Sequence, residues 1–233
     1  MCAAADPAFG AARLRARVPQ EPPAHAPAAG RRALGLARGR DGLVHVPPQA
    51  AAGIPSPLLV LLHGAGSSAS RALDLLAGVA DRAGFVLLAP DSRASTWDVI
   101  AGGYGADVAF LDRALAQVLA RCPVQRGRVA LGGFSDGASY ALSLGLTNGD
   151  LFGRLLAFSP GFMAPAGQVG RPAIYVSHGV EDAVLPIDRC SRRLVPALRD
   201  AGCDVTYDEF DGGHVVPPAV AGRAVDWLGW QPG

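Results

Sequence analysis

From residue 58 to the end of the chain, short apolar runs alternate with stretches of helical periodicity. Strands are expected at 58–62, 85–89, 129–131, 155–158, 173–177 and 205–210, and helices at 69–83, 105–121, directly after residue 135, at 189–201 and at 218–228. Continuously apolar strands are buried on both faces, as in a parallel sheet that helices cover on both sides. The pattern therefore predicts an α/β fold with a mainly parallel, twisted sheet.

The first part of the chain follows other patterns. Residues 33–47, ALGLARGRDGLVHVP, contain two short apolar stretches around a glycine turn, which predicts an antiparallel hairpin at the sheet edge. Residues 1–33 are rich in Ala, Pro and Arg and lack both strand alternation and the apolar run of a secretion signal. We expect a flexible leader over 1–33, with an untranslocated tail favoured over a targeting role, and a single domain over 34–233.

Composition narrows the classes of function. A chain of 233 residues with 50% hydrophobic content can bury one large core. The net charge of +1 and the lack of a basic block argue against a nucleic-acid partner. No apolar run approaches the ~18 residues of a membrane span, and we expect a cytoplasmic protein. The cysteines, Cys2, Cys122, Cys190 and Cys203, have no metal-ligand spacing and are expected to be free thiols.

The segment GGFSDGA, residues 132–138, places Ser135 between a predicted strand and a predicted helix. Ligands of open α/β sheets collect at the carboxyl ends of the strands, so this position favours function. The chain must reverse sharply there, and Gly133 and Gly137 leave room for the turn, as in a G-x-S-x-G nucleophile elbow. Ser135 is therefore the candidate nucleophile, and the alternative is a purely structural turn.

A serine hydroxyl needs a base and a carboxylate that orients the base. Of the five histidines, His214 lies in a glycine-rich loop after the last strand and is the candidate base. Asp182 follows the strand at 173–177 and is the leading candidate acid. The other carboxylates considered are Glu181, Asp188, Asp208 and Asp211. A loop-capping role for His214 and a helix-capping role for Asp182 are the structural alternatives.

An oxyanion hole requires two N–H groups beside the nucleophile. The loop HGAGSS follows the strand at 58–62, and its glycines allow it to approach the elbow. The backbone N–H groups of Ala65 and Asp136 are therefore the expected donors, and His63 is expected to shape the loop.

Together, LLHGAG, GGFSDGA, HGVED and GGH, in this order, resemble the α/β-hydrolase superfamily from about residue 34 to the C-terminus. The similarity is closest to small carboxylesterases, lysophospholipases and acyl-thioesterases without a large cap domain. It implies hydrolysis of carboxylic esters or thioesters, with Ser135, Asp182 and His214 at the matching positions. Many carboxylesterases of that group carry Gln after the nucleophile, where this chain has Asp136; its carboxylate is expected to alter substrate preference or to repel acidic substrates.

The expected reaction is a two-step acyl transfer, from a small-molecule ester or thioester to Ser135 and then to water, with no cofactor and no metal. A catalytically inactive binding protein of the same fold is the alternative from another class, and a peptidase or C–C hydrolase would share the triad.

Two loops are expected to border an open substrate cleft. Residues 91–105 carry Trp97 and Tyr104, and residues 159–170 carry Phe162 and Met163. The alternative for Trp97 and Phe162 is packing beneath their own loops. Neither loop is long enough to form a lid domain.

Overall fold

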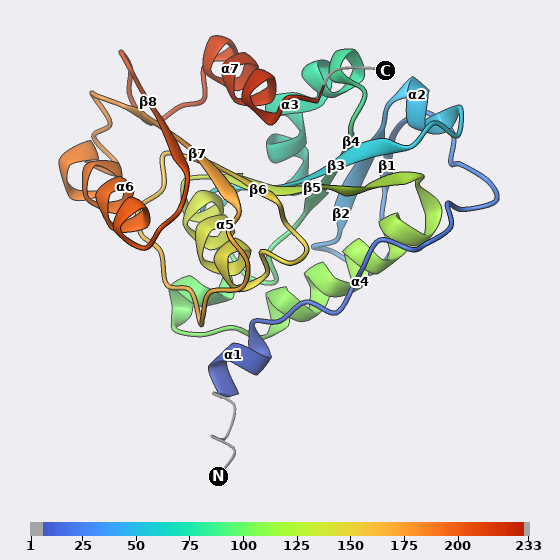
Figure 1. The fold of residues 1–233 in the computed structure, drawn as a ribbon, viewed down its shortest axis with the longest axis horizontal. Helices are drawn as coiled ribbons and strands as arrows, with labels where there is room; N and C mark the ends of the chain where they lie inside the picture. Colours follow the sequence, from blue (N-terminus) through green and yellow to red (C-terminus); the bar gives the residue numbers. More distant parts are fainter. Residues whose placement is uncertain (1–6, 231–233) are drawn as a thin grey trace.

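Eight strands form a single sheet in the computed structural model, which describes residues 7–230 (Figure 1). The strands are β1 Gly30–Ala33, β2 Gly42–Val46, β3 Ser56–Leu62, β4 Val86–Pro90, β5 Val124–Phe134, β6 Arg154–Phe158, β7 Ala173–Gly179 and β8 Val205–Phe210. Their spatial order is β1-β2-β4-β3-β5-β6-β7-β8. The β1–β2 and β2–β4 pairs are antiparallel and the others parallel, which confirms the predicted mixed α/β fold with an N-terminal hairpin.

Helices cover both faces of this sheet. Helices α3 (Ala69–Ala83) and α7 (Pro218–Leu228) pack on one face, and α4 (Ala106–Arg121), α5 (Asp136–Thr147) and α6 (Ser191–Asp200) lie on the other (Figure 1). Shorter helical turns are α1 (Pro7–Ala11), α2 (Pro48–Ala51), η1 (Asp98–Ala101) and η2 (Ile187–Arg189). Two hydrophobic clusters, one on each face, therefore hold the central strands between helical layers.

Strand β3 shows how the sequence produces this layering. Every residue of β3 is buried, and successive side chains alternate between faces. Leu58, Val60 and Leu62 belong to the cluster on the α4–α5 side. Leu59 and Leu61 belong to the cluster on the α3–α7 side. A strand with both faces buried favours apolar residues, which is why residues 57–62 are continuously apolar. The hydroxyl of the buried Ser56 at the start of β3 donates to the carbonyl oxygen of Ile54.

The element boundaries follow the sequence pattern closely, with three differences. The first strand of the hairpin, β1, lies at Gly30–Ala33, within the expected leader, and the apolar stretch after it that we expected to form this strand is a loop. Strand β5 begins at Val124, earlier than expected, because Val124 pairs with Ser56 ahead of a register shift, and the exposed residues 126–128 that follow carry no apolar signal. The helix expected at 189–201 is divided into η2 and α6, and the break falls at Cys190, whose backbone is not helical (φ −115°, ψ −103°).

Part of the N-terminal segment differs from the flexible leader that we expected over residues 1–33. Leu14 is only 2% exposed, and its N–H donates to the side-chain oxygen of Asn148 at 2.9 Å. Arg13 donates to Asp150 and to the carbonyl oxygen of Thr147, and the N–H of Ala16 donates to Asp112. The segment is therefore anchored on α4 and the end of α5 by backbone and arginine contacts, which leave no periodic pattern in the sequence.

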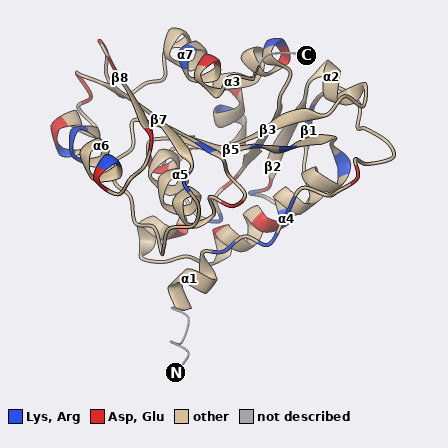
Figure 2. Ribbon diagram, viewed as in Figure 1, with Lys and Arg blue, Asp and Glu red and all other residues tan. Residues whose placement is uncertain are grey.

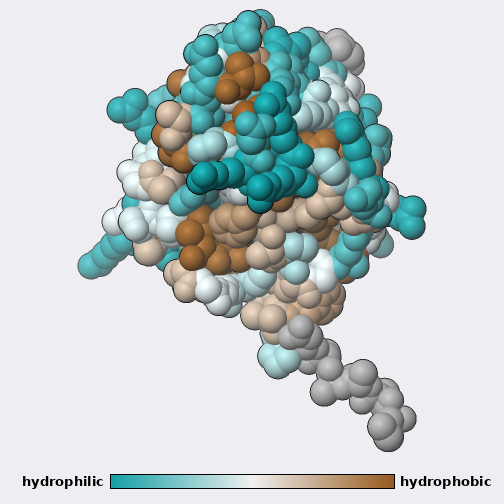
Figure 3. Space-filling model, turned by 90° about the vertical axis from the view of Figure 1, so that its left-hand side faces the viewer, coloured by the Kyte–Doolittle hydropathy of each residue, from teal (hydrophilic) through white to brown (hydrophobic). Residues whose placement is uncertain are grey.

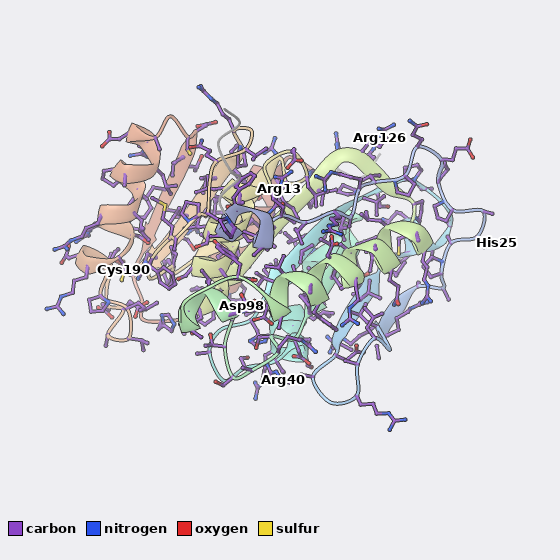
Figure 4. The ribbon with its side chains drawn as sticks, turned by 90° about the horizontal axis from the view of Figure 1, so that it is seen from below. Arg13, His25, Arg40, Asp98, Arg126 and Cys190 are labelled. Atoms are coloured by element: carbon purple, nitrogen blue, oxygen red, sulfur yellow. The ribbon has the colours of Figure 1, made fainter. Side chains whose placement is uncertain are left out.

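Figure 4 places Arg13 beside α1, and His25 in a loop at the opposite end of the molecule from Cys190. Residues 1–6, which also belong to the expected leader, lie outside the described residues.

Charges are mixed on the surface. Figure 2 shows basic and acidic residues interspersed over the helices, and Figure 3 shows hydrophilic residues over the edge formed by α6 and β8, with smaller apolar areas between them. In residues 7–230, no helix combines the length and the apolarity that crossing a bilayer requires. The cysteines of this part of the chain, Cys122, Cys190 and Cys203, are buried free thiols.

Candidate active site

The turn between β5 and α5 holds Ser135 in a strained backbone conformation. Its φ is 59° and its ψ is −121°, a region that residues with a Cβ rarely adopt. A Cβ on Gly133 would lie 2.2 Å from the carbonyl oxygen of Gly137, and a Cβ on Gly137 would lie 2.3 Å from that of Leu62. The Ser135 N–H donates to the carbonyl oxygen of Phe158 on the neighbouring strand at 2.9 Å. Glycine is thus required on both sides of the serine by backbone contacts.

Three side chains that are distant in sequence meet at this turn. The Ser135 hydroxyl lies 2.9 Å from Nε2 of His214, and Nδ1 of His214 lies 2.6 Å from Oδ2 of Asp182. With Nδ1 protonated, the imidazole donates to the carboxylate, and its free Nε2 accepts from the serine hydroxyl. The geometry matches the arrangement of nucleophile, base and orienting acid that a serine hydrolase needs. The catalytic roles of these residues remain predictions.

Asp182 is fixed by the chain that follows it. Its Oδ1 accepts the backbone N–H groups of Val184 and Leu185 at 2.9 and 2.8 Å. Burial opposes ionisation, but the Leu185 N–H and the His214 ring outweigh it, so the pKa of Asp182 lies below its usual value. The carboxylate is therefore charged at neutral pH and can stabilise a proton on His214.

His178 is a neighbour of the acid that the sequence did not identify. Its Nε2 donates to the carbonyl oxygen of Leu185 at 2.8 Å and lies 3.2 Å from Oδ2 of Asp182, while Nδ1 lies 2.6 Å from the Ser191 hydroxyl. Its ring is fully buried, and this burial lowers its pKa. A neutral His178 thus contributes to fixing the carboxylate. The one signal in the sequence is a histidine near the end of an otherwise apolar strand.

The loop that carries His214 lies against the end of β7. A Cβ on Gly179 would come within 2.3 Å of the carbonyl oxygen of Gly212, so only glycine permits this approach. The Glu181 N–H donates to the same oxygen at 2.9 Å. The Phe134 ring packs against the imidazole of His214, with 4.7 Å between the ring centroids. These contacts hold the imidazole over the serine.

Among the described residues, no other carboxylate contacts His214. Asp208 binds Arg223 and Tyr175, and Asp188 pairs with Arg192 at the surface. Glu181 and Asp211 are exposed. No group of three or more His, Cys, Asp or Glu side chains in residues 7–230 is arranged to hold a metal ion.

Replacing Asp182 with Asn is expected to reduce kcat by about 10³- to 10⁴-fold, because the amide would favour the wrong tautomer of His214. Steady-state hydrolysis of p-nitrophenyl butyrate measures this effect. Asp211→Asn is the matched control and should retain activity. A large loss in Asp211→Asn with little loss in Asp182→Asn would show that the acid is misassigned.

The loop after β3 contacts the elbow directly. A Cβ on Gly64 would lie 3.2 Å from Cβ of Ser135. His63 donates from Nδ1 to the carbonyl oxygen of Gly64 at 2.7 Å and accepts the Ser92 N–H on Nε2 at 3.0 Å. This ring is neutral, since burial lowers the pKa of His63. His63 thus fixes the loop through its neutral ring.

The two expected oxyanion donors lie on either side of the serine. Ala65 follows Gly64 in this loop, and Asp136 is the first residue of α5, whose N–H has no acceptor within the helix. The carboxylate of Asp136 accepts the Thr96 hydroxyl at 2.6 Å. A role of these two N–H groups in binding an oxyanion remains a prediction.

The four residues that we expected to contact substrate have different surroundings in the structure. Trp97 is fully buried, donates from Nε1 to the carbonyl oxygen of His63 at 2.8 Å and stacks on Tyr140. Its expected contact with substrate is therefore wrong in this structure, because the ring supports the loop from beneath. Tyr104 is half-buried against the core and donates its hydroxyl to the Ala164 carbonyl oxygen, and burial raises its pKa to about 12.

Phe162 and Met163 are both half-buried. Met163 packs against the core on the α4–α5 side, whereas Phe162 does not belong to either core cluster. The N–H groups of Gly161 and Phe162 donate to the hydroxyl of Ser139, one helical turn beyond Ser135. Among the four residues, Phe162 has the surroundings that best suit a substrate contact, and that contact remains a prediction.

Comparisons with known proteins show which family and which solved structures this chain resembles. The model of the phospholipase/carboxylesterase family matches residues 108–226, just over half of the 233-residue chain. A probable feruloyl esterase C of Aspergillus clavatus is 30% identical over 167 residues, which span 60% of this chain and 60% of the relative.

Solved structures superpose on most of this chain. Esterase PE8 superposes with a TM-score of 0.66 at 26% identity, over 80% of this chain and 96% of that protein. The S-formylglutathione hydrolase of Staphylococcus aureus superposes with a TM-score of 0.69 over 88% of this chain and 98% of that protein, and its 15% identity shows the fold alone. The family match, residues 108–226, contains Ser135, Asp182 and His214. Esterase PE8 superposes on 80% of this chain, so the shared fold extends beyond the matched residues. The chain belongs to the phospholipase/carboxylesterase family, within the α/β-hydrolase fold.

Proposed function

We propose that this protein is a serine esterase that hydrolyses carboxylic esters through an acyl intermediate on Ser135. The observation that carries the proposal is the pair of contacts at His214, 2.9 Å to the serine hydroxyl and 2.6 Å to Asp182. The family match and the esterases among the relatives support the class of substrate.

Each residue has a defined step in the proposed reaction. His214 takes the proton of Ser135 on Nε2 as the serine oxygen attacks the ester carbonyl, and the N–H groups of Ala65 and Asp136 stabilise the oxyanion. The imidazolium then gives this proton to the leaving alcohol oxygen. In the second step His214 removes a proton from water as the water oxygen attacks the acyl carbonyl; the bond to the serine oxygen then breaks, the imidazolium returns the proton to that oxygen, and the carboxylic acid and free Ser135 are released. Asp182 stabilises the imidazolium in both steps.

The backbone strain at Ser135 favours an enzyme over an inactive binding protein. A positive φ at a residue with a Cβ costs of order 1–3 kcal/mol and persists where the surrounding structure enforces it. The strain directs the hydroxyl to His214, whereas a binding site would gain nothing from that contact. A thioester is the second candidate substrate, because an S-formylglutathione hydrolase shares the fold.

A panel of esters varied separately in the acyl and the alcohol part tests this proposal. We expect kcat/KM of about 10⁴ M⁻¹s⁻¹ or more for at least one short or aromatic acyl ester, at the lower end of the range of natural enzymes. An acyl-thioester and a peptide amide of the same acyl group belong to the panel. Binding of esters without turnover of any of them would refute an esterase, and faster turnover of the amide would indicate a peptidase.

A further inference from the structure

A pocket beside the oxyanion loop has a cationic wall that the triad does not use. We infer that it binds a negatively charged group of the substrate, so that the enzyme prefers esters bearing a carboxylate or another anionic group close to the scissile bond. The inference rests on the proposed function and extends it to a substrate class.

The pocket adjoins the reacting serine. Its volume is about 340 Å³, and its lining residues are His63, Gly64, Ser67, Arg71, Ala72, Asp74, Leu75 and Phe134. Gly64 lies beside the side chain of Ser135. Phe134 directly precedes Ser135 in the chain, and its ring packs on the imidazole of His214. An ester whose carbonyl carbon meets the Ser135 hydroxyl can therefore extend one of its arms into this pocket.

Arg71 and Asp74 supply the charges of the pocket wall, both from the first two turns of α3. Asp74 pairs with Arg31 at 2.5 Å, so its charge is compensated. Arg71 is exposed, and within residues 7–230 its guanidinium has no hydrogen-bond or ion-pair partner. The local balance of Arg71, Asp74 and Arg31 is one positive charge. A guanidinium without a partner can bind a carboxylate through two parallel hydrogen bonds.

The remaining pocket walls suit the carbon chain between the ester and its anionic group. Ala72, Leu75 and Phe134 provide apolar surface, and Leu75 and Phe134 pack on the core of the α3–α7 face. A chain of a few methylene groups, or one aromatic ring, would cover this surface while its charge reaches the solvent-exposed guanidinium. Polar uncharged groups would gain less from Arg71.

The negative side chain beside the nucleophile lies outside this pocket. Asp136 is not among the lining residues, and its carboxylate accepts the Thr96 hydroxyl from the loop after β4. The two sides of Ser135 therefore carry opposite charges, Arg71 toward α3 and Asp136 toward the loop containing Thr96. This arrangement limits the repulsion of acidic substrates that we expected from Asp136 to one arm of the ester.

Two pairs of esters distinguish which arm enters the pocket. Mono-p-nitrophenyl adipate and p-nitrophenyl hexanoate differ by a carboxylate on the acyl arm, and 4-carboxyphenyl hexanoate and 4-carbamoylphenyl hexanoate differ by one on the alcohol arm. For one pair, the ratio of kcat/KM for the anionic over the neutral ester should fall about three- to tenfold in Arg71→Gln. Arg71→Lys should restore part of the ratio, and Asp74→Asn should raise it.

Arg82→Gln is the matched control, because Arg82 is exposed near the other end of α3 and, among the described residues, its side chain donates only to the carbonyl oxygen of Gly78. It should leave both ratios unchanged. Sodium chloride at 0.5 M should weaken the preference of the wild type, since salt screens an exposed ion pair. Unchanged ratios for both ester pairs in Arg71→Gln would overturn the inference and leave the esterase proposal intact.

A binding measurement keeps the two proposals separate. Calorimetric titration of the Ser135→Ala variant with monoethyl adipate and with 4-carboxyphenyl hexanoate needs no turnover, and adding Arg71→Gln should weaken the binding of at least one of these esters about three- to tenfold. Equal affinities of the two variants for both esters would contradict the anion-binding pocket. An absence of hydrolysis in the wild type, with either ester bound through Arg71, would instead contradict the esterase.

Discussion

Replacing Ser135 with Ala is expected to reduce kcat/KM for short p-nitrophenyl esters by about 10⁴- to 10⁶-fold. The proposed acyl intermediate forms on its hydroxyl oxygen, and no other hydroxyl among the described residues contacts His214. Removing that oxygen eliminates covalent catalysis and leaves the contribution of the oxyanion donors and of substrate binding. Initial rates at substrate concentrations below KM measure the loss.

Two controls separate lost chemistry from lost structure in this variant. Alanine has a Cβ, as serine does, so the strained backbone at position 135 is the same, and thermal unfolding should change by only a few degrees. Ser70→Ala removes an exposed hydroxyl on α3 and should retain wild-type rates. A Ser135→Ala variant that is folded and retains more than about a tenth of the wild-type rate would mean that another residue is the nucleophile.

Replacing Gly137 with Ala is expected to lower the free energy of unfolding by at least about 3 kcal/mol, or to prevent folding. The new Cβ would lie 2.3 Å from the carbonyl oxygen of Leu62 and 2.6 Å from that of His63. Both atoms belong to the backbone of β3 or the loop after it, so no side-chain rotation relieves the clash. Urea unfolding followed by circular dichroism measures the change.

Gly78→Ala is the matched control for this substitution. Gly78 lies inside α3, and a Cβ there would have no neighbour within 4 Å. Alanine is the better helix former, so this variant should gain about 0.5–1 kcal/mol. Equal stabilities for Gly137→Ala and Gly78→Ala would contradict the close approach of the elbow to β3.

The elements with one repeating pattern could be predicted from the sequence. The amphipathic helix α3 matches its predicted range, because its buried positions recur at the helical period. The strand β8 matches its predicted range as well, although only Val205 of it is buried. The N-terminal segment could not be predicted in the same way. Its position depends on Leu14 and on bonds to Asn148, more than 130 residues away, and no local pattern reports them.

The candidate site follows the same division. Ser135, Asp182 and His214 each lie directly after a strand, so the topology alone indicates that they share one edge of the sheet. The position of Trp97 could not be predicted, because an aromatic residue in a glycine-rich loop can pack inward or line a cleft. Its ring packs inward here because it contacts His63 and Tyr140, which are distant in sequence. The same holds for His178, whose contact with Asp182 depends on how the chain folds back after β7.

Labelling with a fluorophosphonate, followed by peptide mass mapping, tests the central claim most directly, because the reagent bonds covalently only to an activated nucleophile. The proposed mechanism requires one adduct, on the peptide that contains Ser135. The adduct should be absent in Ser135→Ala and should form far more slowly in His214→Ala. An enzyme that hydrolyses esters while Ser135 stays unmodified, or that carries the adduct on another residue, would contradict the mechanism.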